Sequence, residues 1–353
     1  MNNTKRFLLI AVSALLFCDA QAESSVTFSG LIGMGVNYGN HTATGKLYQM
    51  NGTHAAPFIA VTGREDLGGE AAALFRISNY VFLDTGLNAP LESYVGLSSA
   101  RAGTVTLGSM YDLLADLVPY TSERYTSLLA THPGNLDRTV GNSLNNTIKY
   151  KSPKYASFQF GAMYGVGEND STTNTGRVIG AEFSYGSGPL EAMLVWESVH
   201  GVRYAPFARL GVSKLYGIDF AAAPAATVLQ NQETSAAGLA YTADGWRWMA
   251  NYTHTQLSAA TQQATARTID VGAYTYVAAG TRVGGGYSYT TLATYRWNQL
   301  HAHVDYELSR RTSLYALGVL QNAGSGQLAV MRNQPPASSP RQLALEIGMT
   351  HRF

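Results

Sequence analysis

The sequence predicts an all-β protein, a transmembrane barrel of about 16 antiparallel strands, and three observations support this prediction. Segments of about ten residues in which apolar and polar side chains alternate recur along the chain, as expected of strands that cross a membrane. The composition is rich in glycine and tyrosine and poor in charge. The N-terminus has the form of an export signal.

The last twelve residues, 342–353, show the alternation most clearly. One parity is apolar and carries Leu343, Leu345, Ile347, Met349 and Phe353. The other is polar and carries Gln342, Glu346, Thr350 and Arg352. A soluble sandwich would bury the apolar face, whereas a membrane barrel turns it to lipid and lines its lumen with the polar face. One strand does not distinguish these two cases, but the recurrence of the same alternating pattern along the chain does.

The same alternation predicts 16 strands, an even number as bacterial barrels require. The predicted strands are residues 26–38, 57–65, 71–78, 94–98, 104–111, 144–151, 157–167, 177–185, 189–199, 234–242, 247–257, 268–278, 281–291, 298–308, 312–321 and 342–353. Short turns are expected to alternate with longer polar loops, among them 168–176, 258–267 and 322–341. Residues 200–233 are expected to form a long external loop; an extra hairpin at 207–220 would raise the count to 18.

The N-terminus and the composition indicate an exported protein. Lys5 and Arg6 precede an apolar run, and Ala20 to Ala22 has the small-x-small pattern of a cleavage site, so residues 1–22 are predicted to be a signal peptide and 23–353 the barrel domain. A lipoprotein signal through Cys18 is the alternative. Charged residues make up 13% of the chain, against about 25% in typical soluble proteins. The nearly neutral mature chain argues against nucleic-acid binding.

The connection from Asp112 to Ser143 is far longer than a hairpin turn. Its apolar residues would be unusual on an exposed loop: Leu113, Leu114, Leu117, Val118, Leu128, Leu129 and Leu136. We therefore expect this segment to fold back into the lumen. Its charged side chains would then narrow a channel: Asp112, Asp116, Glu123, Arg124, Asp137 and Arg138.

Basic residues on the strands are expected to face this segment. Arg76 has the parity opposite to that of Phe75 and Ile77, and an arginine facing lipid near the midplane would cost about 2–4 kcal/mol, so Arg76 is predicted to point inward. The same reasoning places Lys149 inside, and Arg64 can supply the same wall. Opposed acidic and basic groups across a constriction create a transverse field that favours ions and polar solutes.

Five stretches of the chain resemble one protein family. They are GREDLGGEAAALF (63–75), YVGLSSARAGTVTLGSMYD (94–112), NNTIKYKSPKYASFQFGAMYG (145–165), WNQLHAHVDYELSRRTSLYA (297–316) and GMTHRF (348–353). Together they resemble the trimeric general porins of proteobacterial outer membranes, especially the β-proteobacterial branch. The resemblance covers nearly the whole mature chain. It implies a 16-stranded barrel, a homotrimer, a third external loop folded into the pore, and Phe353 as the assembly signal.

One position departs from the family pattern. Related chains often carry an arginine just before the strand at 144–150, where this chain has Ser143. The missing charge leaves an anion preference open. His301, His303 and Asp305 share one strand face and could bind a metal, but lumen-facing polar residues are the favoured interpretation.

The expected function is passive, non-catalytic diffusion of ions and small hydrophilic solutes, without a cofactor. The expected partners are two further copies of the chain, outer-membrane lipid and lipopolysaccharide, and the barrel assembly machinery. A channel selective for an oligosaccharide or an organic anion is the first alternative. An outer-membrane enzyme or adhesin is the second, although the sequence has no Gly-x-Ser-x-Gly nucleophile motif.

Overall fold

The computed structural model describes residues 24–42, 45–51, 56–122, 128–167, 176–204, 209–215, 218–219, 227–259, 262–324, 326–332, 334 and 336–353. The predicted signal peptide lies outside these residues and stays a prediction. Among the residues described, no helix is long and apolar enough to cross a membrane.

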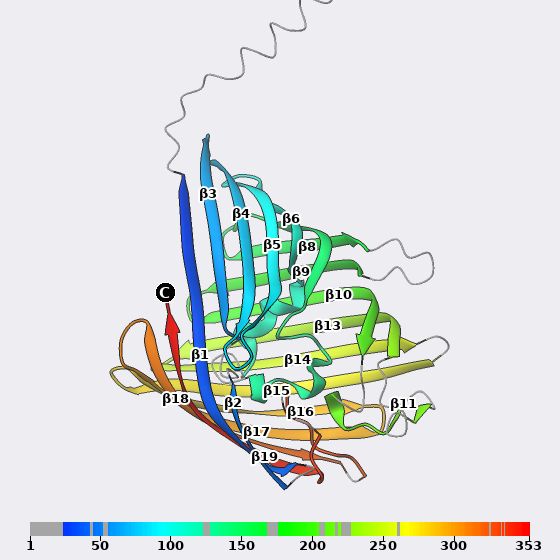
Figure 1. Cartoon of the computed structure of the whole chain (residues 1–353). Coiled ribbons are helices and arrows are strands. Elements are labelled where there is room, and N and C mark those ends of the chain that lie inside the picture. Colours follow the sequence, from blue (N-terminus) through cyan, green and yellow to red (C-terminus); the bar gives the residue numbers. More distant parts are fainter. Residues whose placement is uncertain are drawn as a thin grey trace, which may run out of the picture.

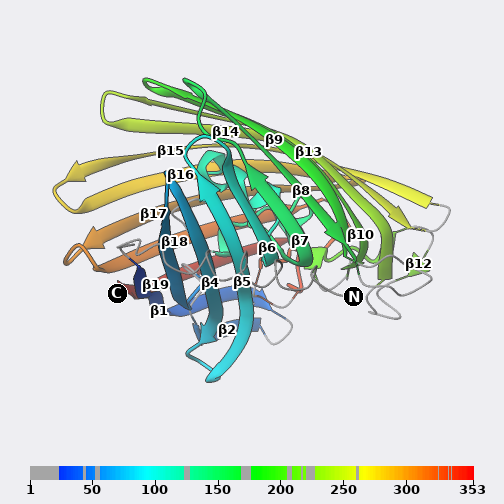
Figure 2. The ribbon, with the colours of Figure 1, turned by 90° about the horizontal axis from the view of Figure 1, so that it is seen from above.

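Strands make up most of the described chain (Figure 1). They are β1 (Ser25–Thr42), β2 (Gly45–Asn51), β3 (Phe58–Gly68), β4 (Ala71–Phe82), β5 (Leu87–Ser99), β6 (Gly103–Tyr111), β7 (Ser143–Lys151), β8 (Phe158–Val166), β9 (Arg177–Ser187), β10 (Leu190–Tyr204), β11 (Lys214–Leu215), β12 (Ile218–Asp219), β13 (Thr227–Ala243), β14 (Trp246–Ala259), β15 (Gln262–Ala278), β16 (Thr281–Leu292), β17 (Tyr295–Glu307), β18 (Thr312–Ala323) and β19 (Arg341–Arg352). Each barrel strand pairs antiparallel with its neighbours, and β1 pairs with β19 to close the ring (Figure 2).

The barrel has 16 strands, as predicted, because β2 and β3 are successive parts of one barrel strand. The first part of β1, Ser25–Leu31, pairs with β3, and a later part from Gly35 to Thr42 pairs with β2. The short strands β11 and β12 pair only with each other. The alternative of an extra barrel hairpin at 207–220 is therefore excluded.

Several strands run further than their apolar residues suggest. β14 and β15 remain paired as far as Ala259 and Gln262, so the predicted long loop at 258–267 is wrong. β10 and β13 likewise extend to Tyr204 and from Thr227, which shortens the predicted loop at 200–233. Polar side chains do not stop a strand beyond the lipid, because the backbone ladder still satisfies its N–H and C=O groups there.

The two faces of the strands differ as the alternation predicts. On β19, Leu345, Ile347 and Met349 are 45%, 69% and 49% exposed on the outside. Gln342 and Glu346, on the other parity, are buried inside the ring. An apolar face turned outward suits lipid, since a soluble protein would bury it.

Phe353 continues the pairing of the last strand with the first. Its backbone N–H donates to the Gly30 carbonyl at 3.1 Å, and its carbonyl accepts from the Gly30 N–H at 3.0 Å. Its ring lies 5.5 Å from the Phe28 ring, centroid to centroid, and a Cβ on Gly30 would lie 2.6 Å from the Phe353 ring. The terminal ring therefore fits because residue 30 is a glycine.

The role of Phe353 as an assembly signal stays a prediction, and Phe28 offers a matched control. Phe353→Ala and Phe28→Ala remove the same ring contact, but only the first changes the terminal residue. We expect Phe353→Ala alone to reduce several-fold the heat-modifiable, folded protein in outer membranes, while both variants refold in detergent equally well. An equal loss of membrane assembly in both variants would show that the terminal phenylalanine acts through packing.

Candidate channel constriction

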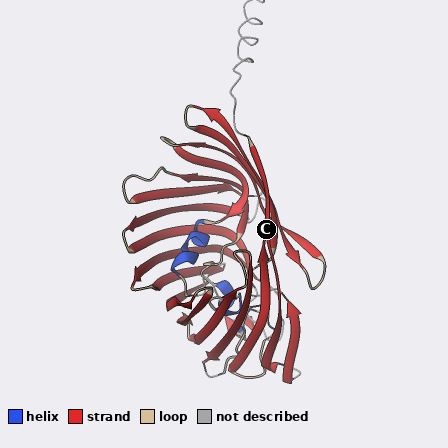
Figure 3. Ribbon diagram, turned by 90° about the vertical axis from the view of Figure 1, so that its left-hand side faces the viewer, coloured by secondary structure: helices blue, strands red, loops and turns tan. Residues whose placement is uncertain are grey.

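The described residues 112–122 and 128–142, which we call the inserted segment, contact the inner side of the ring of strands (Figure 3). They contain three short 3₁₀ helices: η1 (Leu113–Tyr120), η2 (Leu128–Ala130) and η3 (Pro133–Asn135). Asp112 caps η1, because its carboxylate accepts a hydrogen bond from the Ala115 N–H at 3.2 Å. η1 contacts β8, β9, β10, β13 and β14, and η2 contacts β17.

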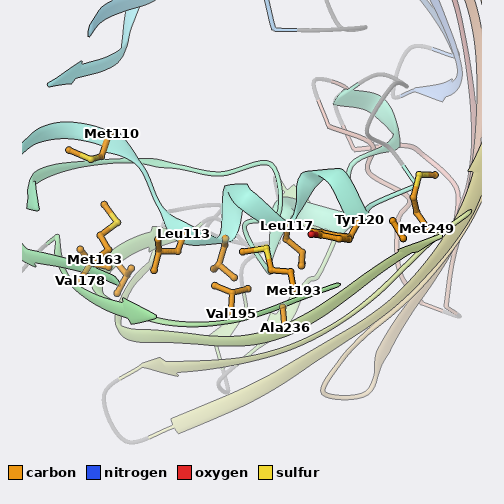
Figure 4. Close-up of a cluster of buried hydrophobic side chains, with 13 residues drawn as sticks. Met110, Leu113, Leu117, Tyr120, Met163, Val178, Met193, Val195, Ala236 and Met249 are labelled. Atoms are coloured by element: carbon orange, nitrogen blue, oxygen red, sulfur yellow. The ribbon is translucent and has the colours of Figure 1, made fainter. Parts of the chain in front are cut away.

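Apolar side chains fix η1 to the wall (Figure 4). Leu113, Leu114 and Leu117 are fully buried. Their partners on the inner face of the barrel include Met163, Val178, Met193, Val195 and Val199. The inner face of β8–β10 is thus apolar where the segment covers it. Burial of each leucine contributes about 1.5–3 kcal/mol.

Buried ion pairs reinforce this attachment. The Arg138 Nε lies 3.1 Å from a carboxylate oxygen of Asp112, and its Nη2 donates to Glu197 on β10. Glu197 also accepts a hydrogen bond from the Leu113 N–H at 2.9 Å. All three charged side chains are at most 2% exposed. One guanidinium therefore joins both ends of the inserted segment to the wall.

A second polar cluster attaches the middle of the segment to β14 and β15. Asp270 accepts hydrogen bonds from the Ser122 N–H at 2.7 Å and from the Asn251 amide at 2.8 Å. His132 lies 2.7 Å from Asp137 and 3.3 Å from Asp270. The barrel wall also forms a hydrogen bond with the backbone of the segment. The side-chain amide of Gln299 donates to the Ala130 carbonyl at 2.7 Å.

Glycines on the inner wall let the segment approach closely. A Cβ built on Gly286 would lie 2.2 Å from the Cβ of Ser122, and one built on Gly272 would lie 2.4 Å from it. Gly272 and Gly286 pair directly across β15 and β16. A Cβ on Gly238 would lie 2.7 Å from Tyr120. These positions have no room for any side chain, so the wall is shaped to receive the segment.

The strands β3–β7 carry a different set of inward charges. Arg76 forms an ion pair with Glu92 at 3.0 Å, and Glu92 accepts the Tyr111 N–H at 3.2 Å. Lys149 donates to the Tyr111 carbonyl. Arg64 is exposed and lies 3.4 Å from the Ser98 hydroxyl. Glu92 and Lys149 thus meet the end of β6, where the inserted segment begins, whereas Ser98, the partner of Arg64, pairs with Thr104 near the start of β6.

The structure therefore divides the nine residues predicted at the constriction. Arg64, Arg76 and Lys149 lie on β3, β4 and β7, and Asp116 forms a partly exposed ion pair with Lys151 at 2.7 Å. Asp112, Asp137 and Arg138 are buried in ion pairs that hold the segment. A buried charge costs less free energy when an opposite charge lies beside it. Glu123 and Arg124 lie outside the described residues. That these residues form the constriction stays a prediction.

Sequence reasoning did not select several residues that matter here. Glu197 and Asp270 hold the segment, and Arg209 and Arg332 line a pocket of about 320 Å³ together with Asn135. The alternation of inward and outward side chains along β15 is enough to place Asp270 inside the barrel. Its partner Ser122 is 148 residues away, so no local pattern could have paired them.

The departure at Ser143 also has a place in the structure. Its hydroxyl donates to the Leu91 carbonyl, which joins β7 to β5 at the start of the strand. Ser143 lines a pocket of about 350 Å³ that also includes Arg138 and His200. The inserted segment thus supplies a guanidinium, that of Arg138, to the lining of the pocket that Ser143 also lines.

The histidines considered as metal ligands face inward, as their parity predicts. His301 and His303 are buried, and Asp305 forms an ion pair with Arg282 at 3.1 Å. Within the described ranges, no group of three or more histidine, cysteine or carboxylate side chains has the arrangement of a metal site.

The Gram-negative porin family matches residues 9–321, which is most of the chain. The chain belongs to this family. Membership places it in the outer membrane. Relatives include outer membrane porin protein 32 of Delftia acidovorans, 32% identical, with 53% of this chain and 58% of that protein covered. An outer membrane porin of Bordetella pertussis is 25% identical, with 56% and 60% covered. The chain spans less than two thirds of the length of either relative.

Solved structures of outer membrane proteins share the fold of this family member. The anion-selective porin from Comamonas acidovorans superposes with a TM-score of 0.79 at 22% identity, covering 94% of this chain and all of that one. The trimer form of OmpT, an outer membrane protein of Vibrio cholerae, gives 0.70 at 13% identity, covering 94% and 99%. At these identities the likeness supports the barrel fold alone.

Proposed function

We propose that the protein is a diffusion porin, which passes ions and small hydrophilic solutes through a water-filled lumen without catalysis. The observation that carries this proposal is a closed barrel of 16 strands whose inserted segment is fixed to one wall. Barrels of about this size enclose an aqueous channel rather than a packed core. Because the contacts of the segment run along β8–β10 and β13–β17, the charged groups on β3–β7 form the other side of the proposed channel.

The proposed constriction lies between the inserted segment and β3–β7. Arg64, Arg76 and Lys149 supply its basic side, and Asp116 supplies an acidic group on the segment. In this arrangement the buried groups Asp112, Asp137 and Arg138 fix the segment that narrows the channel. A transverse field between the two sides would favour hydrated solutes over apolar ones.

A channel selective for organic anions is the second candidate. Arg209 and Arg332, from different loops, line the pocket of about 320 Å³, and no carboxylate is among its described lining residues. One solved structure of similar fold is described as an anion-selective porin. Saturable block of the current by one organic anion would favour this candidate.

The proposed assembly is a homotrimer. A shallow pocket of about 580 Å³ with a mainly apolar lining lies on the outside of β1 and β3–β6. Its lining includes Val26, Ala73, Phe75, Val95 and Leu97. Such a surface suits a second copy of the chain. The trimer form of OmpT, an outer membrane protein of similar fold, supports this proposal. Contact with outer-membrane lipid and lipopolysaccharide, and delivery by the barrel assembly machinery, are proposed as well.

Liposome swelling tests the diffusion proposal. Reconstituted protein is expected to admit neutral sugars at rates that fall steadily with molecular size and rise linearly with concentration. Saturation with one solute, while larger and smaller analogues enter slowly, would favour the selective channel. No swelling beyond that of protein-free liposomes would contradict both.

A further inference from the structure

His132 has an environment that determines its charge. It is 2% exposed, its Nδ1 lies 2.7 Å from an Asp137 oxygen, and its Nε2 lies 3.3 Å from an Asp270 oxygen. A neutral imidazole carries one N–H and has a lone pair on its other nitrogen. Because both nitrogens lie beside carboxylate oxygens, the arrangement favours the doubly protonated, cationic ring over a neutral one.

The two carboxylates are already fixed by other groups. The Thr253 hydroxyl donates to Asp137 at 2.7 Å, and Thr139 donates to it at 3.3 Å. Asp270 accepts from Ser122 and Asn251. The described hydrogen bonds thus orient both anions toward the imidazolium, whose single positive charge opposes two negative ones.

The cluster also spans the inserted segment. Ser122 and His132 belong to that segment, and both contact Asp270 on β15, while Asp137 bonds to Thr253 on β14. Two points ten residues apart in the segment are therefore fixed to one wall carboxylate. Without the positive charge, Asp137 and Asp270 would repel each other in a site with little water to screen them.

We propose that His132 is the residue that positions the inserted segment against the β14–β15 wall, and that loss of its proton releases the segment into the lumen and closes the channel. This proposal rests on the channel function proposed above. The closure is expected on the alkaline side of neutrality.

The direction of the pH dependence follows from the pKa of His132. Burial acts to lower this pKa, but Asp137 and Asp270 outweigh burial and raise it well above the ordinary value of about 6.5. A raised pKa means that the attachment is complete below the ordinary value and is lost as pH rises through the raised one. His132 in turn lowers the pKa of Asp137, so acid weakens the cluster only well below neutrality.

Among the described residues, the titratable groups around His132 are Asp137 on its own segment, Asp270 on β15 and His301 on β17. His301 contacts the cluster through its Nε2, 3.0 Å from the Ser122 hydroxyl. Within the part of the chain that the structure describes, His132 is the residue in ion-pair contact with both carboxylates, so its proton loss removes the positive charge that they share.

The test compares channel closures across pH in planar bilayers. Closures of the wild-type channel at fixed voltage are counted from about pH 5 to about pH 10, which spans the ordinary imidazole pKa of about 6.5. We expect few closures below neutrality and at least a several-fold rise in the alkaline range. His132→Gln should close frequently at every pH and lose the alkaline rise. His351→Gln, near the end of β19, is the matched control and should keep the wild-type profile.

Each outcome separates the two proposals. Absence of channels at any pH contradicts the channel function itself. Open channels whose closures have the same pH profile in wild type and His132→Gln contradict the positioning role of His132 alone. If His132→Gln does not fold, the wild-type profile still decides, since a closure rate that stays constant through the alkaline range contradicts the proposal.

Discussion

Replacing Arg138 by alanine is expected to lower the free energy of unfolding by about 3–5 kcal/mol, because it removes the ion-pair partner of two buried carboxylates. Asp112 and Glu197 are both fully buried, and both lie on Arg138. The measurement is urea unfolding of detergent-refolded protein, followed by tryptophan fluorescence. The loss should also increase current noise, because Arg138 joins both ends of the inserted segment to β10.

The control for this variant is an ion pair on the surface. Arg101 lies 3.4 Å from Glu70, but the two side chains are 89% and 59% exposed. Arg101→Ala should therefore change the free energy of unfolding by less than about 1 kcal/mol. A double variant, Arg138→Ala with Glu197→Gln, should recover part of the loss. Equal effects of the two arginine substitutions would contradict the assigned role of Arg138.

Replacing Gly286 by alanine is expected to push the inserted segment into the lumen and reduce single-channel conductance. The new Cβ would lie 2.2 Å from the Cβ of Ser122, whereas carbon atoms in contact prefer about 3.5–4.0 Å. The segment must move by more than 1 Å or the fold must absorb the strain, which costs about 1–3 kcal/mol in overpacked sites. Single-channel recording in symmetric salt measures the change.

Gly318 on β18 provides the comparison for Gly286. It faces outward beside Leu345, where a Cβ would meet only the end of a flexible side chain at 3.3 Å. Gly318→Ala should leave conductance unchanged. Wild-type conductance in folded Gly286→Ala would mean that the segment does not depend on this glycine for its position.

The faces of the strands could be predicted because they follow from local alternation. Ile347 and Glu346 are adjacent in sequence and lie on opposite sides of the barrel, as parity requires. The contact of the inserted segment with the barrel wall could be expected from its leucines, because a loop exposed to water would not bury them. The strand ends were predicted less well, since β14 continues through polar residues to Ala259.

The attachment of the inserted segment could not be predicted from sequence. Its contacts join residues far apart in the chain, such as Ser122 with Asp270, and no spacing rule relates them. Charge alone did not separate groups that face the channel from groups that hold the segment. Asp116 and Asp112 are four residues apart, yet one is partly exposed and the other is buried.

The most direct test of the channel function is single-channel recording in planar bilayers with a salt gradient. Purified, refolded protein is expected to insert as conducting units that close in three equal steps, with a current linear in salt concentration and a small reversal potential. The sign of that potential shows whether the channel prefers anions or cations. A preference for anions would mean that Arg64, Lys149 and the other basic groups compensate for the missing arginine at Ser143. Protein that is folded by its heat-modifiable mobility but gives no conductance steps would contradict the channel function.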